Sequence, residues 1–195
     1  MSLDAAYFDR LYASTDDPWG FSTRWYEQRK YALTLAALPA PHYGNALEIG
    51  CSVGVFTSML ARRCSALLAL DPSSRALEQA RARVPGNVTL RQGSVPRDWP
   101  SGTYDLVVLS EVGYYLDPDD LAQLLDLIEA SLGPGWTVLA CHWRHAVADY
   151  PQSGDAVHRA LQRWPRLSRT LEEDFVLDVL LPGGAPSVAR QQGLL

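Results

Sequence analysis

Apolar residues along this chain fall into short continuous runs that alternate with longer segments in which they recur every three or four positions. Short runs are typical of buried strands, and the longer spacing is typical of helices that bury one face. From Ala46 onward the two patterns alternate, as they do in a parallel sheet with helices on both faces. Seven strands are predicted, over residues 46–49, 66–71, 87–93, 104–110, 136–143, 173–181 and 186–192.

Four helices are predicted between these strands, over residues 55–64, 73–84, 118–132 and 153–164. The segment VPRDWPSG after the third strand contains two prolines and is too short for a helix. The segment PGGAP between the sixth and seventh strands can close an antiparallel hairpin but not a parallel crossover. The predicted fold is therefore α/β, a doubly wound Rossmann-like seven-stranded sheet that is mostly parallel with an antiparallel last strand.

The residues before the first strand follow a different pattern, in which two helices are expected around a loop at Ser14–Gly20. At 195 residues and 47% hydrophobic content, the chain is long enough for one domain with a substantial core, but not for two. We therefore expect a single domain, 1–195, in which residues 1–44 form a helical cap or lid and residues 45–195 form the Rossmann-like core.

Composition and charge exclude several classes of function. A formal net charge of −5 argues against general binding to nucleic acid or to an anionic membrane. No apolar run approaches the length of about 20 residues that a membrane-spanning helix needs, and the first residues lack the pattern of a secretion signal. We expect a cytoplasmic protein that acts on a small molecule or on another protein.

The rarer residue types narrow the chemistry further. Cys51, Cys64 and Cys141 have no CxxC spacing and no histidine at ligand spacing, which predicts buried thiols rather than a disulfide or a zinc site. Lys30 is the only lysine and stands far from any glycine-rich turn, so a Walker A loop is excluded and a pyridoxal enzyme is disfavoured. The acids of DPDD at 117–120 are expected to begin a helix and not to bind a metal.

The segment NALEIGCSVGVFTSML at 45–60 carries the strongest functional signal. A buried strand leads into a turn that contains Gly50, Ser52 and Gly54, and a helix begins near Val55. In doubly wound sheets ligands bind beside such a turn, because free N–H groups of the helix start are available there. The glycine spacing does not match the GxGxxG pattern of dinucleotide-binding enzymes, which disfavours a nicotinamide-dependent oxidoreductase.

Two acids define the ligand more closely. Glu48 stands two residues before Gly50, where a carboxylate repels a pyrophosphate but attracts an ammonium or a sulfonium. Asp71 ends the second strand about 20 residues after the turn, where an acid accepts hydrogen bonds from ribose hydroxyls. Together these features predict S-adenosylmethionine as the cofactor. In the structural alternative, Gly50 only permits the turn and Cys51 only fills space.

Four segments in sequence order, LEIGCSVGVFT, LALD, QGSVP and YDLVVLSEVGYYL, resemble the class I S-adenosylmethionine-dependent methyltransferases. The upstream segment DPWGFSTRWYEQRKYALTLAALP, together with SEVGYYL, resembles more narrowly the NodS-like group, whose namesake N-methylates a chitooligosaccharide nodulation precursor. The resemblance implies a set of cofactor-binding residues: Glu48, Gly50, Cys51 and Ser52 at the methionine end, Asp71 at the ribose, and Ser94 and Val95 at the adenine. Serine stands at position 94 in place of the usual acid.

The residues before the sheet supply further candidates for cofactor binding. Trp19, Tyr26 and Arg29 are expected to close over the cofactor, with Arg29 binding its carboxylate through paired hydrogen bonds. Tyr26 and Arg29 are three positions apart on a predicted helix and therefore share a face. Packing at the protein surface is the alternative for all three.

Methyl transfer from a sulfonium needs an aligned nucleophile, exclusion of water and removal of a proton. Glu111 follows the fourth strand at the ligand-binding edge of the sheet, where it is expected to border the cofactor and to act as general base. Its alternative role is that of a structural carboxylate that orients the loop or the upstream helix. Tyr114 and Tyr115 in the same segment are expected to line the acceptor pocket.

The segment HWRH after the fifth strand reaches the same edge of the sheet. Its residues His142, Trp143, Arg144 and His145 are predicted to contact the acceptor, with His142 as a second candidate base. A solvated loop is the alternative for either histidine. Four arginines near the end of the chain would mark an anionic acceptor or a solvated helix face: Arg159, Arg163, Arg166 and Arg169.

The sequence therefore predicts an S-adenosylmethionine-dependent methyltransferase that acts on nitrogen or oxygen of a small-molecule, sugar-like or amino-bearing acceptor. The alternative is an interaction protein that binds the cofactor but is catalytically silent.

Overall fold

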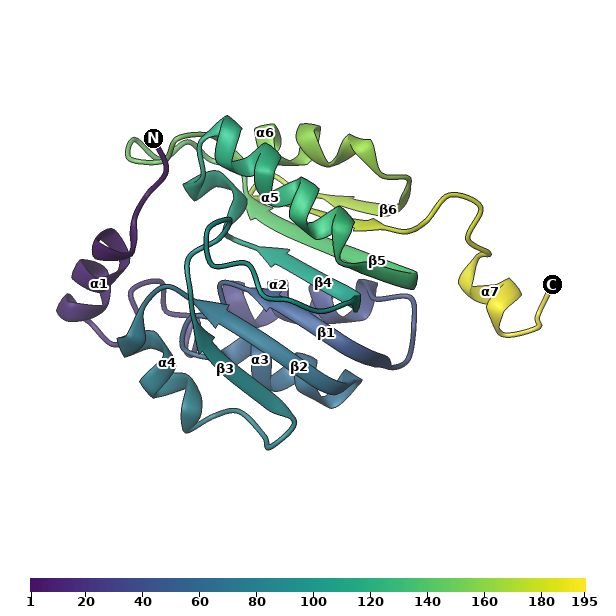
Figure 1. Ribbon diagram of the computed structural model, residues 1–195, viewed down its shortest axis with the longest axis horizontal. Coiled ribbons are helices and arrows are strands. Elements are labelled where there is room, and N and C mark those ends of the chain that lie inside the picture. Colours follow the sequence, from purple (N-terminus) through teal and green to yellow (C-terminus); the bar gives the residue numbers. More distant parts are fainter.

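Seven strands form one mixed sheet in the order β3-β2-β1-β4-β5-β7-β6 (Figure 1), and the computed structural model describes residues 1–195. The strands are β1 (Tyr43–Ile49), β2 (Cys64–Asp71), β3 (Val88–Gln92), β4 (Tyr104–Ser110), β5 (Leu132–Trp143), β6 (Arg166–Leu171) and β7 (Phe175–Leu180). Strands β1 to β5 pair in parallel, whereas β7 runs antiparallel to both β5 and β6. The predicted α/β fold, mostly parallel with an antiparallel last strand, is confirmed.

The chain forms seven helices, most of which cover the two faces of this sheet. They are α1 (Ala5–Ser14), α2 (Trp25–Ala37), α3 (Val55–Leu60), α4 (Ser74–Arg81), α5 (Pro118–Ala130), α6 (Gly154–Ala160) and α7 (Val188–Gln191), with short 3-10 turns η1 (Ala61–Arg63), η2 (Gly113–Tyr115) and η3 (Leu161–Arg163). Helices α2 and α3 pack on one set of strand side chains, which includes Leu106 and Val108 of β4. Helices α5 and α6 pack on the other set, which includes Val107 and Leu109. The period of two along a strand thus gives the molecule its two cores.

The C-terminal part departs from the predicted strands. The segment 186–192, predicted as the seventh strand, instead contains helix α7, which Ser187 caps and which has no buried residues. The predicted sixth strand at 173–181 is β7, so the hairpin turn lies at 172–174 and not at PGGAP. The sequence pattern does not reveal β6, because its residues RLSRTL are mostly polar and exposed, as suits an edge strand.

Local signals in the sequence are confirmed at several helix ends and connections. The Ser73 hydroxyl accepts a hydrogen bond at the start of α4, and the Asp117 carboxylate does so at the start of α5. No helix lies between β3 and β4, and Trp99 from this connection packs against the core. All three cysteines are free and buried. None of the helices combines the length and the apolar composition needed to cross a bilayer.

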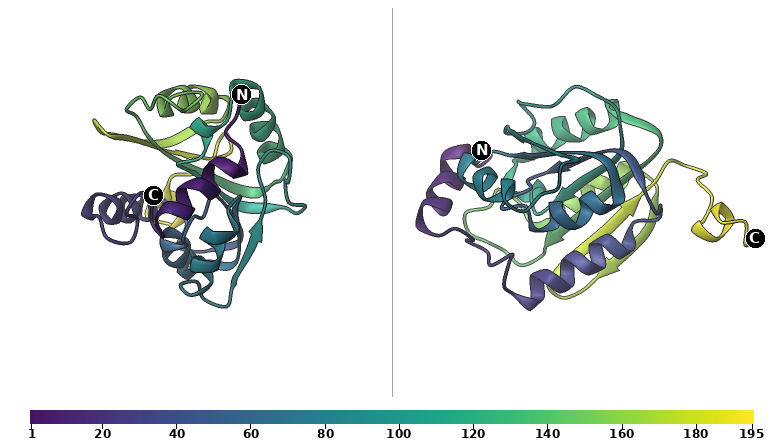
Figure 2. Two further views of the ribbon diagram at one scale, coloured as in Figure 1. Left: turned by 90° about the vertical axis from the view of Figure 1, so that its left-hand side faces the viewer. Right: turned by 90° about the horizontal axis from the view of Figure 1, so that it is seen from below.

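The segment before β1 has two parts that lie in different places. Helix α2 contacts α3 and lies along one face of the sheet, whereas α1 contacts α4 and stands at the end of the molecule toward which the parallel strands point (Figure 2). Strand β1 begins at Tyr43, close to the predicted boundary at residue 44. The description of residues 1–44 as a cap remains a prediction.

Candidate functional site

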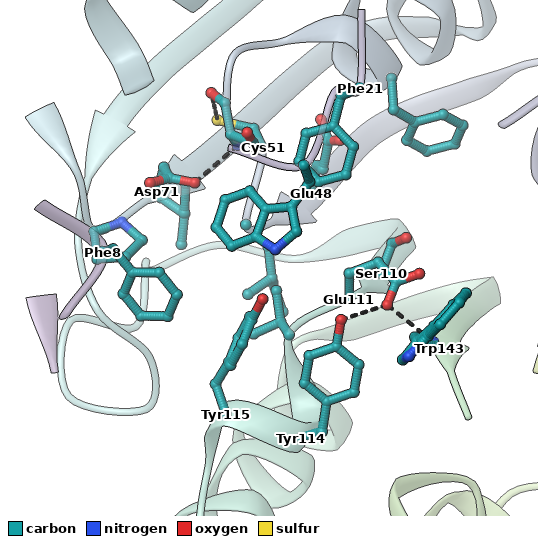
Figure 3. Close-up of a pocket in the computed structure, with 18 of the residues that line it drawn as sticks. Phe8, Phe21, Glu48, Cys51, Asp71, Ser110, Glu111, Tyr114, Tyr115 and Trp143 are labelled. Atoms are coloured by element: carbon teal, nitrogen blue, oxygen red, sulfur yellow. Dashed lines mark hydrogen bonds between the residues drawn. The ribbon is translucent and has the colours of Figure 1, made fainter. Parts of the chain in front are cut away.

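A cavity of about 480 Å³ lies at the carboxyl ends of the parallel strands, beside α1 (Figure 3). This is where doubly wound sheets bind their ligands. Most residues singled out in the sequence line it: Trp19, Tyr26, Glu48, Gly50, Cys51, Ser52, Asp71, Ser94, Val95, Glu111, Tyr114, Tyr115 and Trp143. Four others do not line it: Arg29, His142, Arg144 and His145. The fold thus brings most of the predicted cofactor and acceptor residues into one space.

The turn after β1 holds its backbone in the left-handed region. Gly50 and Gly54 have φ angles of 77° and 80°. A Cβ atom on Gly50 would lie 2.3 Å from Cγ2 of Val112, so a larger residue would displace the loop after β4. The N–H groups of Gly50 and Cys51 both donate to the Leu70 carbonyl at 2.8 Å. The turn is therefore held in place by β2 and presents its backbone to the cavity.

Glu48 is a buried carboxyl group with an unsatisfied oxygen. Its side chain lines the cavity and is 3% exposed, and its Oε2 atom has no hydrogen-bond partner. Burial raises the pKa of Glu48 to about 7; the neighbouring Thr57 hydroxyl opposes the shift, and the charge of Asp71 adds to it. A cationic group beside this oxygen would stabilise the charged form of the side chain.

Asp71 at the end of β2 supports the turn as well as lining the cavity. Its Oδ2 atom accepts from the N–H of Ser52 at 2.8 Å, and its Oδ1 atom accepts from the N–H of Ser73 at 2.9 Å. Burial raises the pKa of Asp71 to about 6, although these two N–H groups oppose the shift. Each carboxylate oxygen has two lone pairs, so each retains the capacity to accept a hydroxyl group of a ligand.

Glu111 joins three elements through its carboxylate. It follows β4 with a φ angle of 57°, which is rare for a residue other than glycine. Its Oε1 atom accepts from the Lys30 ammonium at 2.5 Å. Its Oε2 atom accepts from the Tyr114 hydroxyl at 2.5 Å and from the Trp143 N–H at 2.9 Å (Figure 3). These three bonds fit the alternative role predicted for Glu111, that of a carboxylate that orients the loop and the upstream helix.

Lys30 lies between two buried carboxylates. Its Nζ atom is 2.5 Å from Glu111 Oε1 and 3.0 Å from Glu27 Oε2, and Lys30 and Glu27 are 2% and 7% exposed. Burial opposes the charge on Lys30, but the two carboxylates hold its pKa above the ordinary value. The Glu27 contact lacks hydrogen-bond geometry, so Glu27 Oε2 has no hydrogen-bond partner, and neither does the Tyr26 hydroxyl. Both Tyr26 and Glu27 line the cavity.

Aromatic side chains form much of the remaining wall. They come from both N-terminal helices and the loop between them, from α3, from the turn after β4, and from the end of β5 and the loop after it: Phe8, Tyr12, Trp19, Phe21, Tyr26, Tyr31, Phe56, Tyr114, Tyr115, Trp143 and Tyr150. Tyr114 and Tyr150 stack with ring centroids 4.9 Å apart, and Phe8 packs edge-on against Tyr115 at 5.0 Å. Such a wall excludes water and binds flat or apolar parts of a ligand.

Arg29 does not face the cavity, which corrects its predicted role at the cofactor carboxylate. Its guanidinium donates to Glu172 at 2.8 and 2.9 Å near the surface. Neighbouring residues on a helix point about 100° apart, and Lys30 takes the inward direction. Arg24, at the N-cap of α2, lines the cavity instead.

His142 lies inside the protein, which corrects its predicted roles as a base and as an acceptor contact. It is fully buried, its Nε2 atom accepts from the N–H of Gly113 at 3.0 Å, and its Nδ1 atom is 3.1 Å from His158 Nε2. His158 Nδ1 is in turn 2.7 Å from Asp178 Oδ2. Strand side chains alternate between faces, so His142 points away from the cavity that Trp143 lines.

The chain of bonds from Gly113 to Asp178 fixes the proton on each imidazole. Because Nε2 of His142 accepts a hydrogen bond, Nδ1 carries the proton and donates to His158. Burial holds the pKa of His142 well below its ordinary value. Gly113 begins the turn that carries Tyr114, so this chain anchors one wall of the cavity.

Arg144 and His145 do not line the cavity but pair with carboxylates of α6 and of the turn between β6 and β7, which corrects their predicted role as acceptor contacts. The Arg144 guanidinium donates to Asp155 at 2.8 and 3.1 Å. His145 Nε2 lies 2.8 Å from Asp174 Oδ1. Each side chain thus binds a carboxylate, Asp155 or Asp174, that lies on another segment of the surface.

Two of the C-terminal arginines neutralise a carboxylate inside the fold. Arg169 and Arg166 lie 2.6 Å and 3.4 Å from the Asp178 carboxylate, and Asp178 is 1% exposed. Burial opposes its charge, but hydrogen bonds from Arg169 and His158 hold the pKa of Asp178 at about 2. These two arginines therefore serve the fold and mark neither an acceptor site nor a solvated helix face.

The N-terminal segment bridges two sides of the cavity. The N–H of Leu3 donates to the Tyr115 carbonyl at 2.9 Å, beyond β4. On the β2 side, Asp9 accepts from the Ser73 hydroxyl at 2.9 Å, and the hydroxyls of Tyr12 and Ser52 are 2.5 Å apart. Residues 2–12 thus contact both the β4 side and the turn side of the cavity.

Arg24, Glu27 and Lys30 are cavity residues that the sequence analysis does not identify. The signal that would have found them is helical spacing in the segment RWYEQRKY, where positions three or four apart share a face. Glu27, Lys30 and Tyr31 occupy such a face and are all buried. A buried acid and a buried lysine one turn apart indicate a site rather than a solvated surface.

The chain matches the model of the family described as Nodulation protein S (NodS) over residues 8–148. It is 29% identical to Nodulation protein S of Bradyrhizobium diazoefficiens over 190 residues, which are 88% of this chain and 90% of that protein.

Solved structures resemble the chain as well. A crystal structure from Pseudomonas syringae, of a protein described as a methyltransferase by inference, is 42% identical with a TM-score of 0.72 and covers 81% of this chain and 99% of that one. The N-methyltransferase NodS from Bradyrhizobium japonicum WM9, in complex with S-adenosyl-L-homocysteine, is 23% identical with a TM-score of 0.83 and covers 93% of this chain and 100% of that one. The sheet order and its flanking helices are those of the class I methyltransferase fold.

Proposed function

This chain belongs to the NodS family of S-adenosylmethionine-dependent methyltransferases, and we propose that it methylates the amino nitrogen of a small-molecule acceptor. The charge of the cavity lining carries this proposal. Five carboxyl side chains line the cavity, but only two cationic side chains do. A sulfonium cofactor and a protonated amine both bring positive charge, so both fit a cavity with surplus carboxylates.

The residues at the ends of β1 and β2 fit S-adenosylmethionine. Glu48, whose Oε2 atom is buried without a partner, would hold the ammonium of the amino-acid end. The Gly50 turn leaves room for that end to approach the backbone, and Asp71 has lone pairs for the ribose hydroxyls. Arg24 would bind the carboxylate, because it lines the cavity and makes no ion pair. Ser94 and Val95 would border the adenine.

The other side of the cavity would receive the acceptor. When bound, the cofactor supplies a methyl group made electrophilic by a positively charged sulfur. The chain aligns the acceptor and excludes water from it. Tyr114, Tyr115 and Trp143 line this side of the cavity and keep water away from the amine. Glu111 positions two of them, since it accepts hydrogen bonds from the Tyr114 hydroxyl and the Trp143 N–H.

The test has two steps. Calorimetry first measures binding of S-adenosylhomocysteine, for which a Kd of about 1–100 μM is expected. Radiolabelled S-adenosylmethionine is then offered with chitooligosaccharides that end in a free glucosamine, with their fully N-acetylated counterparts, and with simple alcohols. We expect label only in the amine-bearing compounds.

The outcomes separate the alternatives. Absence of S-adenosylhomocysteine binding by the folded protein contradicts the proposal as a whole. Label in the hydroxyl compounds alone would make the protein an O-methyltransferase. Cofactor binding without transfer to any of these compounds or to a bacterial extract would favour the catalytically silent binding protein.

A further inference from the structure

A base for the acceptor must offer a free lone pair toward the cavity, and the two carboxylates near Lys30 differ in this respect. The Glu111 carboxylate accepts from three donors: the Lys30 ammonium, the Tyr114 hydroxyl and the Trp143 N–H. Protonating it would disrupt the contacts that hold the acceptor wall. Its geometry is that of a positioning residue.

Glu27 has the opposite arrangement. It is 7% exposed, it lines the cavity from α2, and its Oε2 atom has no hydrogen-bond partner. The Tyr26 hydroxyl, on the adjacent residue, is also buried without a partner and lines the same cavity. Apart from the Lys30 ammonium 3.0 Å from Glu27 Oε2, neither atom has a polar partner, so both can still bind a polar group of a ligand.

The need to neutralise the charge of Lys30 does not explain why Glu27 is buried beside it. Glu111 already pairs with Lys30 at 2.5 Å and with hydrogen-bond geometry, whereas Glu27 is at 3.0 Å without it. Glu27 and Glu111 share the Lys30 ammonium, and Arg24 is the other cationic side chain of a cavity lined by five carboxyl groups. The lining therefore carries surplus negative charge, which a cationic ligand would offset.

We propose that Glu27 is the general base of the reaction: its Oε2 atom binds the acceptor's ammonium and takes its proton, while the Tyr26 hydroxyl orients the amine. This assignment rests on the proposed function. In the reaction, one proton passes from the ammonium to Glu27 and leaves a free amine and a neutral carboxylic acid. The amine lone pair then forms the new N–C bond as the C–S bond breaks, and the electron pair of that bond stays on sulfur.

The charged groups around Glu27 favour this role. Lys30 and Arg24 face it from its own helix, and Glu111 faces it from the loop after β4. Burial raises the pKa of Glu27 above the ordinary value for a glutamate, while Lys30 opposes the shift. A base works best when its pKa lies close to the working pH, so this environment improves on that of a solvated glutamate.

The first experiment compares Glu27→Gln with wild type and with Glu173→Gln, which removes an exposed carboxylate that does not itself line the cavity. With a glucosamine-terminated chitooligosaccharide as acceptor, kcat of Glu27→Gln should fall by about 100-fold or more. Its Kd for S-adenosylhomocysteine should stay within about twofold of wild type. Wild-type kcat should fall as the pH drops through the pKa of Glu27, and this acidic limb should be absent from Glu27→Gln. A kcat within about threefold of wild type overturns the assignment.

Two further variants guard against a merely structural effect. Glu27→Asp keeps a carboxylate and should recover part of kcat. Tyr26→Phe should raise the KM for the acceptor more than it lowers kcat. If Glu27→Asp is as slow as Glu27→Gln while both bind S-adenosylhomocysteine normally, Glu27 is not the base.

A second experiment needs no turnover. NMR titration of the S-adenosylhomocysteine-saturated protein with benzylammonium should show saturable binding in wild type and Glu173→Gln, and affinity at least about tenfold weaker in Glu27→Gln. Benzyl alcohol should not distinguish the three proteins. No preference of wild type for the ammonium refutes the assignment, whereas failure of the proposed function appears earlier, as absent S-adenosylhomocysteine binding.

Discussion

Replacing Glu48 by glutamine tests the electrostatics of the cavity directly. Burial raises the pKa of this side chain from 4.5 to about 7, and one of its oxygens has no partner. An acid whose pKa is higher in the folded chain than in the unfolded chain destabilises the fold once it must ionise. This penalty is absent below the ordinary pKa of 4.5, grows with rising pH, and approaches its full size above about 7. At pH 7 it amounts to about 3 kcal/mol.

We therefore expect Glu48→Gln to be more stable than wild type in the absence of ligand. The gain should be about 1–3 kcal/mol at pH 7, because the amide is still a buried polar group, and below about 1 kcal/mol at pH 5, where the carboxyl group is largely protonated. The same change removes the proposed partner of the cofactor ammonium. Affinity for S-adenosylhomocysteine should fall by at least about tenfold.

Urea denaturation of both proteins at pH 5 and pH 7, with and without S-adenosylhomocysteine, measures the stability change at each pH and the change in affinity. Glu78→Gln, on the exposed side of α4, is the matched control and should change nothing. A ligand-free Glu48→Gln that is less stable than wild type at pH 7 would mean that the carboxylate is already satisfied. Unchanged affinity for S-adenosylhomocysteine would place the cofactor ammonium elsewhere.

Two further substitutions test the walls of the cavity. Gly50→Ala should fold but bind S-adenosylhomocysteine at least about tenfold more weakly in calorimetry, because the φ angle of Gly50 is 77° and the added methyl group would displace the adjoining loop. The control is Gly86→Ala, whose added methyl group would meet no neighbouring atom. Equal affinities of the two variants would refute the steric argument. His158→Phe removes the partner between His142 and Asp178, so the free energy of unfolding should fall by about 2–3 kcal/mol in urea denaturation. It should also lower kcat more than cofactor affinity, and unchanged kinetics would show that this chain of bonds does not position the acceptor wall.

The sequence predicts the parallel part of the sheet well because those strands are apolar and their turns carry Gly, Pro and capping residues. It fails at the C-terminal edge for a physical reason. Strand β6 is an edge strand whose arginines pair with the buried Asp178 of β7, so its pattern is that of a polar segment. Segment 186–192 has the alternation of a strand but lies beyond the sheet, where Ser187 caps a short helix.

The candidate site shows a similar division. Glu48, Gly50 and Asp71 could be placed because each stands at a fixed distance from a strand end. The sequence analysis predicts that His142 and Trp143 both contact the acceptor, but adjacent strand residues face opposite sides and only Trp143 lines the cavity. The role of Glu27 depends on which oxygen lacks a partner, and such a property arises only from tertiary packing.

The contacts of residues 2–12 with both sides of the cavity have a practical consequence for protein production. The amino group of Met1 lies 3.5 Å from Asp117. A purification tag at this end would remove that contact and disturb the neighbouring hydrogen bond from the Leu3 N–H to the Tyr115 carbonyl. Helix α7 has no buried residues and lies away from the sheet (Figure 1). Kinetic measurements of ligand exchange are therefore best made with the tag fused after Leu195, where it does not disturb the contacts of residues 2–12.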